Sequence, residues 1–370
     1  MTNRERVQAI LHYQPTDHVP CVHFGYWQET RHKWLEEGYL TPEEATSDTK
    51  TALKQGFDFE WTSNYSLGAG LNPGFETRVV AEFPDGSRHV RNGQGVTLLE
   101  RPGATSIPAE IAHLLTDRAS WEEHYLPRVQ YKESRVPVKG LLEHKARFEA
   151  GQLSPDHPYG FYIGGLYGTI RDIAGVVGLS YIQADDEDLY EEIIRTFGEL
   201  HVKCTEEACK YIVPGMFDFG HFWEDICFRS GPLVIPSVFD ELVGPYYKRI
   251  TDSLRGVGID ICSLDCDGCI DALIPTWVSN GVNTMFPIEV GVWDASIAPW
   301  RKKYGKELRG VGGMNKKVFA EDFAAIDREL ERLQTLVALG GYIPCPDHRI
   351  APDAKWENVL YYTKRFKELF

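Results

Sequence analysis

The chain has 370 residues, and its 39 basic and 54 acidic side chains give a net charge of −15. Apolar residues make up 43% and aromatic residues 12% of the chain, which is enough for a large core and excludes an intrinsically disordered protein. An acidic chain without a basic block is a poor match for nucleic acid or an anionic membrane, so we expect neither as a partner.

The first residues are charged and lead directly into a helix, without the apolar segment of a secretory signal. No apolar run approaches the roughly 18 residues that a membrane span needs. Eight cysteines in so long a chain do not form a small secreted framework. We therefore expect a cytoplasmic protein whose cysteines are thiols, with some available as metal ligands.

The N-terminal third predicts a helix, a strand and a hairpin. Thr2 and Glu5 have the spacing of a capping box and predict the start of a short helix. Residues 21–25 predict a first strand. Residues 77–100 alternate around the turn sequence at 84–87 and predict a β-hairpin, which we interpret as an insertion on one rim of the fold.

From residue 159 onward, strands and helices alternate regularly. A strand at 159–165 is followed by a long helix that starts after Asp186, with an apolar stripe at a spacing of three or four residues. Later strands are predicted at 215–220, 258–264, 282–287, 308–313 and 341–344. Helices are predicted between and after them at 237–255, 270–280, 294–304, 318–339 and 354–370, the fourth of them ending at Gly340.

Strict alternation of this kind predicts a parallel sheet with right-handed crossovers. No Gly-x-Gly-x-x-Gly follows any of the strands, which disfavours a dinucleotide-binding sheet. We therefore predict an α/β fold, a (β/α)8 TIM barrel with an N-terminal helical extension and a β-hairpin insertion. No linker divides the chain, so we expect one domain over residues 1–370.

In such barrels, reacting groups lie where strands run into the following loops. Asp265 and Asp267 follow the strand at 258–264, and residues two apart on a strand face the same way. Two carboxylates this close need a cation, a proton or basic donors between them. The alternative is that they cap the next helix or pair with arginines.

Two further strand ends carry groups that bind metals. Glu289 follows the strand at 282–287, and Cys345 and His348 follow the last strand on a proline-rich loop. A mixture of carboxylate, thiol and imidazole suits a catalytic metal site. A lone histidine is also often a hydrogen-bonded structural residue. Cys266 and Cys269 form a single Cys-x-x-Cys, which we interpret as packing thiols.

A carboxylate among aromatic side chains follows the strand at 215–220. Glu224 in these surroundings should have a raised pKa, as a general acid needs. The alternative is that Glu224 forms a structural ion pair with Arg229 or Arg171. Catalytic candidates at these strand ends are Glu224, His221 and Tyr167. Aromatic side chains could also wall a ligand pocket, and the substrate-binding candidates are Trp223, Arg171 and Tyr26.

Three segments together resemble the uroporphyrinogen decarboxylase superfamily. They are RERVQAIL at 4–11 with DHVP at 17–20, then GPLVIP at 231–236 with PYYKRI at 245–250, and finally GGYIPCPDHRIAPD at 340–353. The resemblance extends over nearly the whole chain and implies a TIM barrel. It also implies one of two chemistries, namely decarboxylation of a tetrapyrrole or corrinoid-dependent methyl transfer.

Two departures from the family pattern separate these chemistries. The stretch HFGYWQ at 23–28 lacks the arginines with which the decarboxylases hold their substrate. In the family's methyltransferases that act on methylated thiol carriers, a His-x-Cys pair and a later Cys bind zinc. Asp265 and Asp267 occupy the positions of the pair in this sequence, and the position of the later Cys falls near His348. Harder ligands suit activation of an ether oxygen, and the sequence most resembles the O-demethylating branch.

The resemblance therefore implies an enzyme that moves a methyl group from a methoxylated, aromatic substrate to a corrinoid on a separate protein. Zn²⁺ would be held by some members of one set of residues: Asp265, Asp267, Glu289, Cys345 and His348. Glu224 or His221 would protonate the leaving oxygen. The chain shows no Asp-x-His-x-x-Gly motif, so we do not expect it to hold the corrinoid itself.

Two alternatives stay open. One is a decarboxylase or lyase of uroporphyrinogen decarboxylase type that acts on a smaller carboxylated substrate without metal, with Arg171 or Arg349 as anchor. The other is a catalytically inert barrel that binds a corrinoid protein or a ligand. The sequence is compatible with a homodimer but does not fix the oligomeric state.

Overall fold

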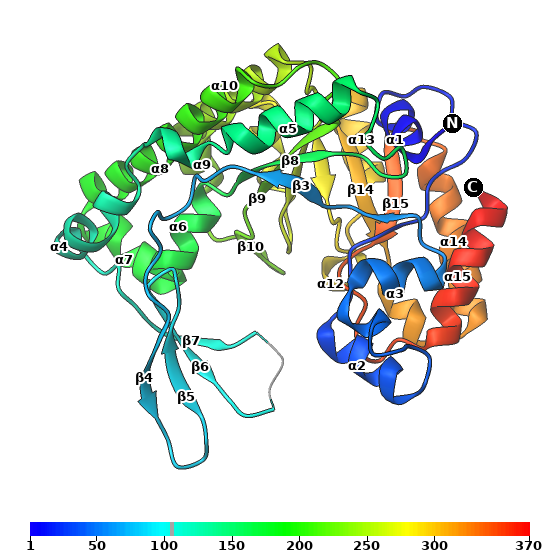
Figure 1. Cartoon of the computed structure of the whole chain (residues 1–370), viewed down its shortest axis with the longest axis horizontal. Coiled ribbons are helices and arrows are strands. Elements are labelled where there is room, and N and C mark those ends of the chain that lie inside the picture. The colour runs from blue at the N-terminus through cyan, green and yellow to red at the C-terminus, as the bar shows by residue number, and fades with distance from the viewer. Residues whose placement is uncertain (104–106) are drawn as a thin grey trace.

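The computed structural model describes residues 1–103 and 107–370. Its centre is a parallel sheet in the order β15-β14-β13-β12-β9-β8-β3, which Figure 1 shows with helices along its outer side. The strands are β3 (Ser63–Ser66), β8 (Gly160–Gly164), β9 (Phe219–Trp223), β12 (Cys262–Asp265), β13 (Thr284–Phe286), β14 (Arg309–Met314) and β15 (Tyr342–Pro346).

An eighth position closes this sheet into a barrel. β1 (Val22–His23) pairs in parallel with β2 (Phe59–Glu60), which leads directly into β3. On its other side, the chain after β1 meets the chain after β15 in a parallel bridge between Tyr26 and Ile350. The amide of Ile350 donates to the carbonyl of Gly25 at 3.0 Å. The predicted (β/α)8 TIM barrel is confirmed.

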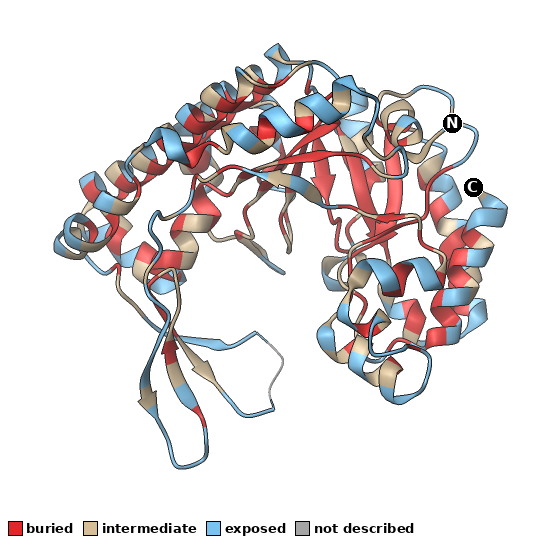
Figure 2. Ribbon diagram, viewed as in Figure 1, coloured by how far each residue is buried: buried red, intermediate tan, exposed pale blue. Residues whose placement is uncertain are grey.

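The helices cover the barrel with their apolar faces inward, as Figure 2 shows by burial. Thr2 and Glu5 form the predicted capping box of α1, and the predicted stripe of α8 is buried at every position. The helices are α1 (Asn3–Leu11), α2 (Gln28–Glu36), α3 (Asp48–Gln55), α4 (Arg118–Ser120), α5 (Val138–Glu149), α6 (Tyr167–Ala174), α7 (Val176–Asp185), α8 (Glu187–Cys209), α9 (Pro236–Leu242), α10 (Gly244–Gly256), α11 (Ile274–Ser279), α12 (Val290–Trp293), α13 (Ile297–Tyr304), α14 (Phe323–Val337) and α15 (Trp356–Leu369).

The insertion is larger than the predicted hairpin. Four antiparallel strands in chain order form a sheet, which we call the arm: β4 (Arg78–Glu82), β5 (Arg88–Arg91), β6 (Val96–Glu100) and β7 (Ala109–His113). The arm projects from the barrel (Figure 1), and both faces of β7 are mostly exposed. A strand that buries neither face has no alternation of apolar residues, which is why the sequence did not predict it.

Other boundaries also differ from the predictions. The helix predicted at 237–255 is two helices, because Val243 ends α9 and α10 restarts at Gly244 with Pro245 in its first turn, where its missing N–H costs nothing. The strand predicted at 215–220 begins later, at Phe219, so His221 and Trp223 lie within β9. Among the described residues, no helix has the length and apolar character to cross a bilayer.

Candidate active site

Three aspartates converge at the carboxyl ends of two neighbouring strands. Asp265 ends β12, Asp267 follows two residues later, and Asp225 follows β9, which pairs with β12. One carboxylate oxygen from each lies within 4.8 Å of the others. The amide of Asp267 donates to Oδ1 of Asp225 at 3.0 Å. We call Asp225, Asp265 and Asp267 the acid cluster.

Sequence reasoning identified two of these three residues. The alternation along β12 placed Asp265 and Asp267 on one face, and in the structure an oxygen of each lies within 4.8 Å of the other. Asp225 was not identified from the sequence as a metal ligand. Its backbone has φ +48°, a left-handed conformation that Asp tolerates better than most residues, and no sequence pattern signals that turn.

The acid cluster is electrostatically unfavourable without a cation. Burial raises the pKa of Asp265 well above its ordinary value, and the charges of Asp225 and Asp267 add to the rise. Burial and Asp267 raise the pKa of Asp225 to about 6. Oδ1 of Asp267 is buried without a hydrogen-bond partner in the described chain. Hard oxygen donors in this arrangement fit a divalent cation.

His348 completes the cluster from the opposite side of the mouth. Its Nε2 lies 3.2 Å from Oδ2 of Asp267. The imidazole stacks on Trp27 with ring centroids 5.6 Å apart and meets the edge of Phe24 at the same distance. The ring is therefore held at one orientation, with a nitrogen directed at the acid cluster.

The other two predicted ligands, Glu289 and Cys345, are not among the three grouped carboxylates. Oε2 of Glu289 accepts a hydrogen bond from the amide of Gly268 at 2.6 Å, and burial and Asp267 raise the Glu289 pKa to about 7. Its carboxylate is therefore held next to the loop that carries Asp267, where the charge of His348 also acts on it. Cys345 is fully buried within β15, and burial raises its thiol pKa well above the ordinary value. The geometry gives no support to Cys345 as a ligand.

Glu224 and Tyr167, predicted as catalytic, have hydrogen-bond partners inside the fold. Glu224 is completely buried, and its carboxylate accepts from the amide of Leu166 at 3.1 Å, from the amide of Gly168 and from the hydroxyl of Tyr247. Burial raises its pKa to about 7. The hydroxyl of Tyr167 lies 2.9 Å from that of Tyr190. Glu224 thus joins the end of β9 to α6 and α10, and Tyr167 joins α6 to α8.

His221 faces the barrel interior together with a tyrosine that the sequence analysis missed. Its ring is buried, and Nδ1 has no partner among the described residues. Burial lowers the His221 pKa to about 4, so the ring is neutral at pH 7. The ring of Tyr162 lies 6.2 Å away, and burial and Asp265 raise its pKa to about 12. The signal in the sequence that could have identified Tyr162 was its position near the end of the predicted strand at 159–165.

Of the three predicted substrate-binding residues, two lie beside the acid cluster. Arg171 donates to the carbonyl of Asp225 at 2.8 Å, and its guanidinium lies 5.8 Å from the ring centre of Trp223. It also pairs with Asp172 at 2.9 Å. Tyr26 is 1% exposed, and its hydroxyl donates to Gln55 at 2.7 Å. Tyr26 therefore belongs to the core.

Asp347 connects the loops that surround the mouth, which sequence reasoning did not foresee. Its two carboxylate oxygens accept from the amide of Gly291 at 2.7 Å and from the amide of Lys316 at 3.1 Å. The ammonium of Lys316 donates to the carbonyl of Arg349 at 2.9 Å. The loops after β13, β14 and β15 are thus tied together next to His348.

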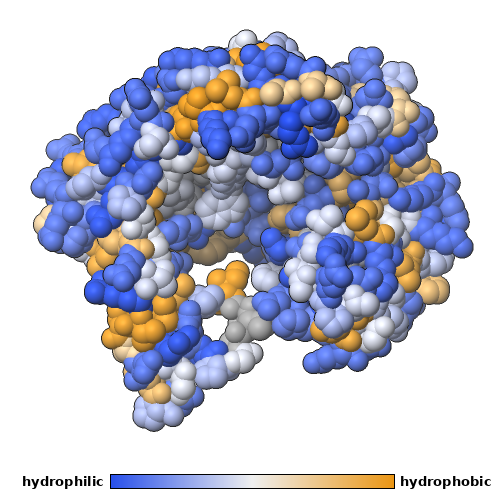
Figure 3. Space-filling view, in the orientation of Figure 1, coloured by the Kyte–Doolittle hydropathy of each residue, from blue (hydrophilic) through white to orange (hydrophobic). Residues whose placement is uncertain are grey.

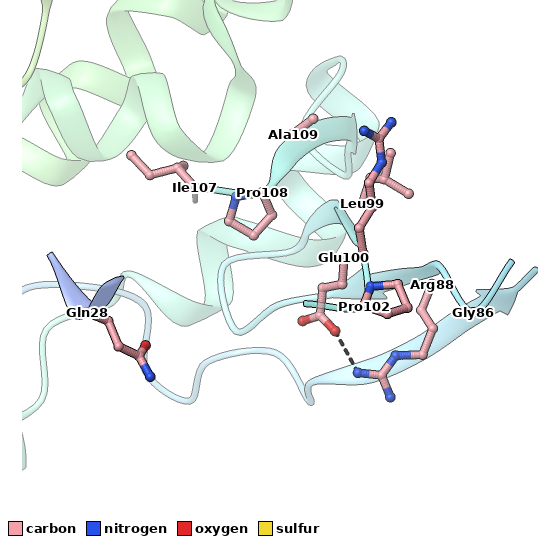
Figure 4. A pocket seen from close by; sticks show the side chains of 10 residues that line it. Gln28, Gly86, Arg88, Leu99, Glu100, Pro102, Ile107, Pro108 and Ala109 are labelled. Carbon is pink, nitrogen blue, oxygen red and sulfur yellow. Dashed lines mark hydrogen bonds and ion pairs between the residues drawn. The ribbon is translucent and has the colours of Figure 1, made fainter. Parts of the chain in front are cut away.

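A hollow lies in front of this mouth. Figure 3 shows it between the arm and the part of the chain that carries α2 and α3. A cavity of about 830 Å³ lies along the arm, with Gln28 from the start of α2 on its far side. Figure 4 shows the ion pair of Arg88 and Glu100, at 2.8 Å, among its lining residues. A volume of this size is typical of pockets that bind small molecules.

The solved structures that resemble this chain include a methyltransferase from Methanosarcina mazei, with a TM-score of 0.60 and 16% identity over 100% of this chain and 99% of that one. A B12-independent methionine synthase from Shewanella sp. W3-18-1 in complex with selenomethionine has a TM-score of 0.43 and 12% identity, covering 89% and 90% of the two chains. A putative B12-independent methionine synthase from Listeria monocytogenes has a TM-score of 0.39 and 12% identity, covering 96% and 97%.

At these identities, the first likeness establishes the fold, which it shares over its whole length, and the other two are too distant to carry an argument. No family model matches the sequence, and comparison with characterised proteins finds no match. The function has to be argued from the site.

Proposed function

We propose that this protein is a metal-dependent methyltransferase that transfers a methyl group from a methoxylated aromatic substrate to a corrinoid held by a separate protein. The observation that carries the proposal is the acid cluster at the barrel mouth, with His348 directed at Asp267. The sequence resemblance to corrinoid-dependent methyltransferases supports it, as does the fold shared with a protein described as a methyltransferase.

Asp225, Asp265, Asp267 and His348 would hold the metal, which we propose to be Zn²⁺. Compared with the ligands expected from the sequence, Asp225 joins the set and Cys345 leaves it, while Glu289 accepts a hydrogen bond from Gly268 next to Asp267. A bound divalent ion acts as a Lewis acid that stabilises negative charge on an oxygen. Such stabilisation is what cleavage of an ether with a poor leaving group requires.

The chain's own residues supply the remaining functions. The hydroxyl of Tyr162 is protonated at pH 7 and is influenced by Asp265, so it could donate a hydrogen bond to the substrate oxygen. Neutral His221 lines the same interior and could hold or accept a proton at its unpartnered Nδ1. Trp223 provides an apolar wall that Arg171 fixes in place. Glu224 holds β9 against α6 and does not reach the substrate.

The decarboxylase alternative has less support from the geometry. Such an enzyme needs a free cation to anchor a carboxylate. Arg171 is already paired with Asp172, and Arg349 lies 3.5 Å from Asp48. Three aspartates at the mouth would also repel a negatively charged substrate.

The test is methyl transfer from 2-methoxyphenol to reduced cobalamin, followed by the change in the corrinoid absorbance spectrum. Metal-free protein prepared with a chelator should be inactive and should regain activity with one equivalent of Zn²⁺. Asp267→Asn should lower the rate at least about 100-fold, in the range seen when a group that acts in the transition state is removed. Asp294→Asn is the matched control, because Asp294 is exposed and lies outside the acid cluster.

Full activity after chelation would overturn the metal-dependent proposal. The same variants test whether the protein is a catalytically inert barrel. In that case, neither wild type nor Asp267→Asn would transfer methyl groups, and both would bind any partner protein equally well.

A further inference from the structure

A second, smaller cavity lies beside the barrel mouth, where the arm joins the barrel. Its volume is about 240 Å³, and it is enclosed by the chain after β3, the end of β8 and helices α6 and α8. Gly93 and Gln94, from the turn between β5 and β6, close it on the side of the arm. Tyr162 belongs to its wall, so it adjoins the interior that holds His221.

The lining of this cavity is uncharged. Among the described residues that form it, there is no Asp, Glu, Lys or Arg. Apolar walls come from Leu71, Ile163 and Ile173, and polar groups from Gln94 and Thr169. The buried guanidinium of Arg135 is already bonded to the carbonyls of Gly68 and Gly70 beside this wall. Because a buried charge needs a partner and no lining side chain supplies one, the cavity favours an uncharged molecule over a carboxylate or an ammonium group.

One buried side chain, that of His201, has one ring nitrogen in this space without a hydrogen-bond partner. His201 on α8 is 2% exposed, and its Nδ1 lies 2.8 Å from the carbonyl oxygen of Phe197. A carbonyl oxygen only accepts, so Nδ1 carries the hydrogen and Nε2 carries the free lone pair. Burial lowers the pKa of His201 to about 4, which keeps the ring neutral.

Nothing in the described part of the chain donates to Nε2 of His201. This nitrogen faces Gly164, where a Cβ would lie only 3.0 Å from it. Gly164 has φ +105° and no side chain, so the space in front of Nε2 stays open. An acceptor in an otherwise uncharged cavity selects a ligand with one hydrogen-bond donor.

We infer that this cavity binds an uncharged molecule the size of one six-membered ring, whose hydroxyl or amine donates a hydrogen bond to Nε2 of His201. The volume is sufficient, since a cavity of about 150 Å³ accommodates benzene. The identification of this ligand with the ring of the methyl donor rests on the proposed function. The binding itself does not.

The test compares a neutral and an anionic fluorinated ring by ¹⁹F NMR titration of the full-length protein. 4-Fluorophenol should bind, and 4-fluorobenzoate should bind at least tenfold more weakly because of its charge. Leu71→Trp should abolish 4-fluorophenol binding by filling the cavity from its half-buried rim. His201→Leu should weaken binding about tenfold, which is the value of one hydrogen bond.

Leu142→Trp on the exposed side of α5 is the control and should bind the phenol as wild type does. Circular dichroism melts show whether each variant folds, and Leu71→Trp decides the question should His201→Leu fail to fold. Equal affinity for both probes, or unchanged phenol binding in Leu71→Trp, would overturn the inference.

A zinc titration on the same samples separates this inference from the proposed function. Zinc binding without phenol binding overturns only the cavity's role. Phenol binding without zinc binding overturns only the metal-dependent methyl transfer.

Discussion

Nε2 of His348 and Oδ2 of Asp267 lie 3.2 Å apart, which joins the loop after the last barrel strand to the loop after β12. The two residues are 81 positions apart in the sequence, since 348 − 267 = 81. The contact places an imidazole nitrogen next to the carboxylates of the acid cluster. It is the relationship from which we derive the first prediction.

His348→Ala should weaken zinc binding by about 10- to 100-fold, the range found when a group that ligates a metal or orients its ligands is removed. The loss follows because Asp267 would lose the ring that faces it, while the acid cluster would remain. Competition with a fluorescent zinc chelator measures the affinity. His18→Ala, at an exposed position near the N-terminus, should leave it unchanged. Equal affinities in the two variants would show that His348 takes no part in the site.

Asp347→Asn should weaken zinc binding about tenfold without lowering the melting temperature by much. An asparagine can accept only one of the two amide hydrogen bonds that Asp347 accepts from Gly291 and Lys316. The loop that carries His348 would then be less well fixed. Asp353→Asn, an exposed change on the same loop, is the control. Unchanged affinity in Asp347→Asn would contradict the positioning role.

Glu224→Gln should destabilise the fold by about 2–3 kcal/mol. An amide NH₂ would face N–H or O–H donors that the buried carboxylate now satisfies. Urea denaturation measures the free energy of unfolding, and Glu241→Gln at an exposed position serves as the comparison. A variant of undiminished stability that has lost all methyl transfer would instead support the general-acid role that the sequence suggested.

The barrel was predictable from the sequence because its strands and helices alternate at regular intervals, and Asp265 and Asp267 because they are two residues apart on one strand. Asp225 was not, since its place depends on the pairing of β9 with β12 and on a left-handed turn. The surroundings of Glu224 were hard to predict for a related reason. Glu224 alternates with Trp223, so it faces the helices, and its aromatic neighbours mark a core rather than a pocket.

The end of β15 is another place where the sequence did not show which side chains are buried and which reach the mouth. Cys345, Asp347 and His348 stand close together in the sequence, but β15 extends to Pro346 and keeps Cys345 in the core. Only the residues beyond the strand reach the mouth. Burial within a strand depends on where the strand ends, which the prolines at 344 and 346 obscured.

Acid should destabilise the protein partly through His23. Nδ1 of this buried ring accepts from the amide of Gly25 at 3.0 Å, and burial lowers its pKa to about 3. The unfolded value is about 6.5. Between these values His23 binds a proton in the unfolded chain but not in the folded chain. The contribution of the neutral ring to the free energy of unfolding is therefore complete above pH 6.5 and is lost as the pH falls towards 3.

His23→Asn removes this titration and keeps an acceptor for Gly25. Between pH 7 and pH 5, the free energy of unfolding of wild type should therefore fall by about 2 kcal/mol more than that of the variant. Urea denaturation at both pH values measures the difference. His18→Asn should follow wild type. Parallel pH dependences of wild type and His23→Asn would contradict the account.

The most direct test of the central claim is a crystal structure of the protein grown with excess Zn²⁺, with data collected on both sides of the zinc absorption edge. We predict one strong anomalous peak at the barrel mouth, bonded to oxygens of Asp225, Asp265 and Asp267 and to a nitrogen of His348. An acid cluster without a peak, its carboxylates bonded instead to arginines or to one another, would contradict it.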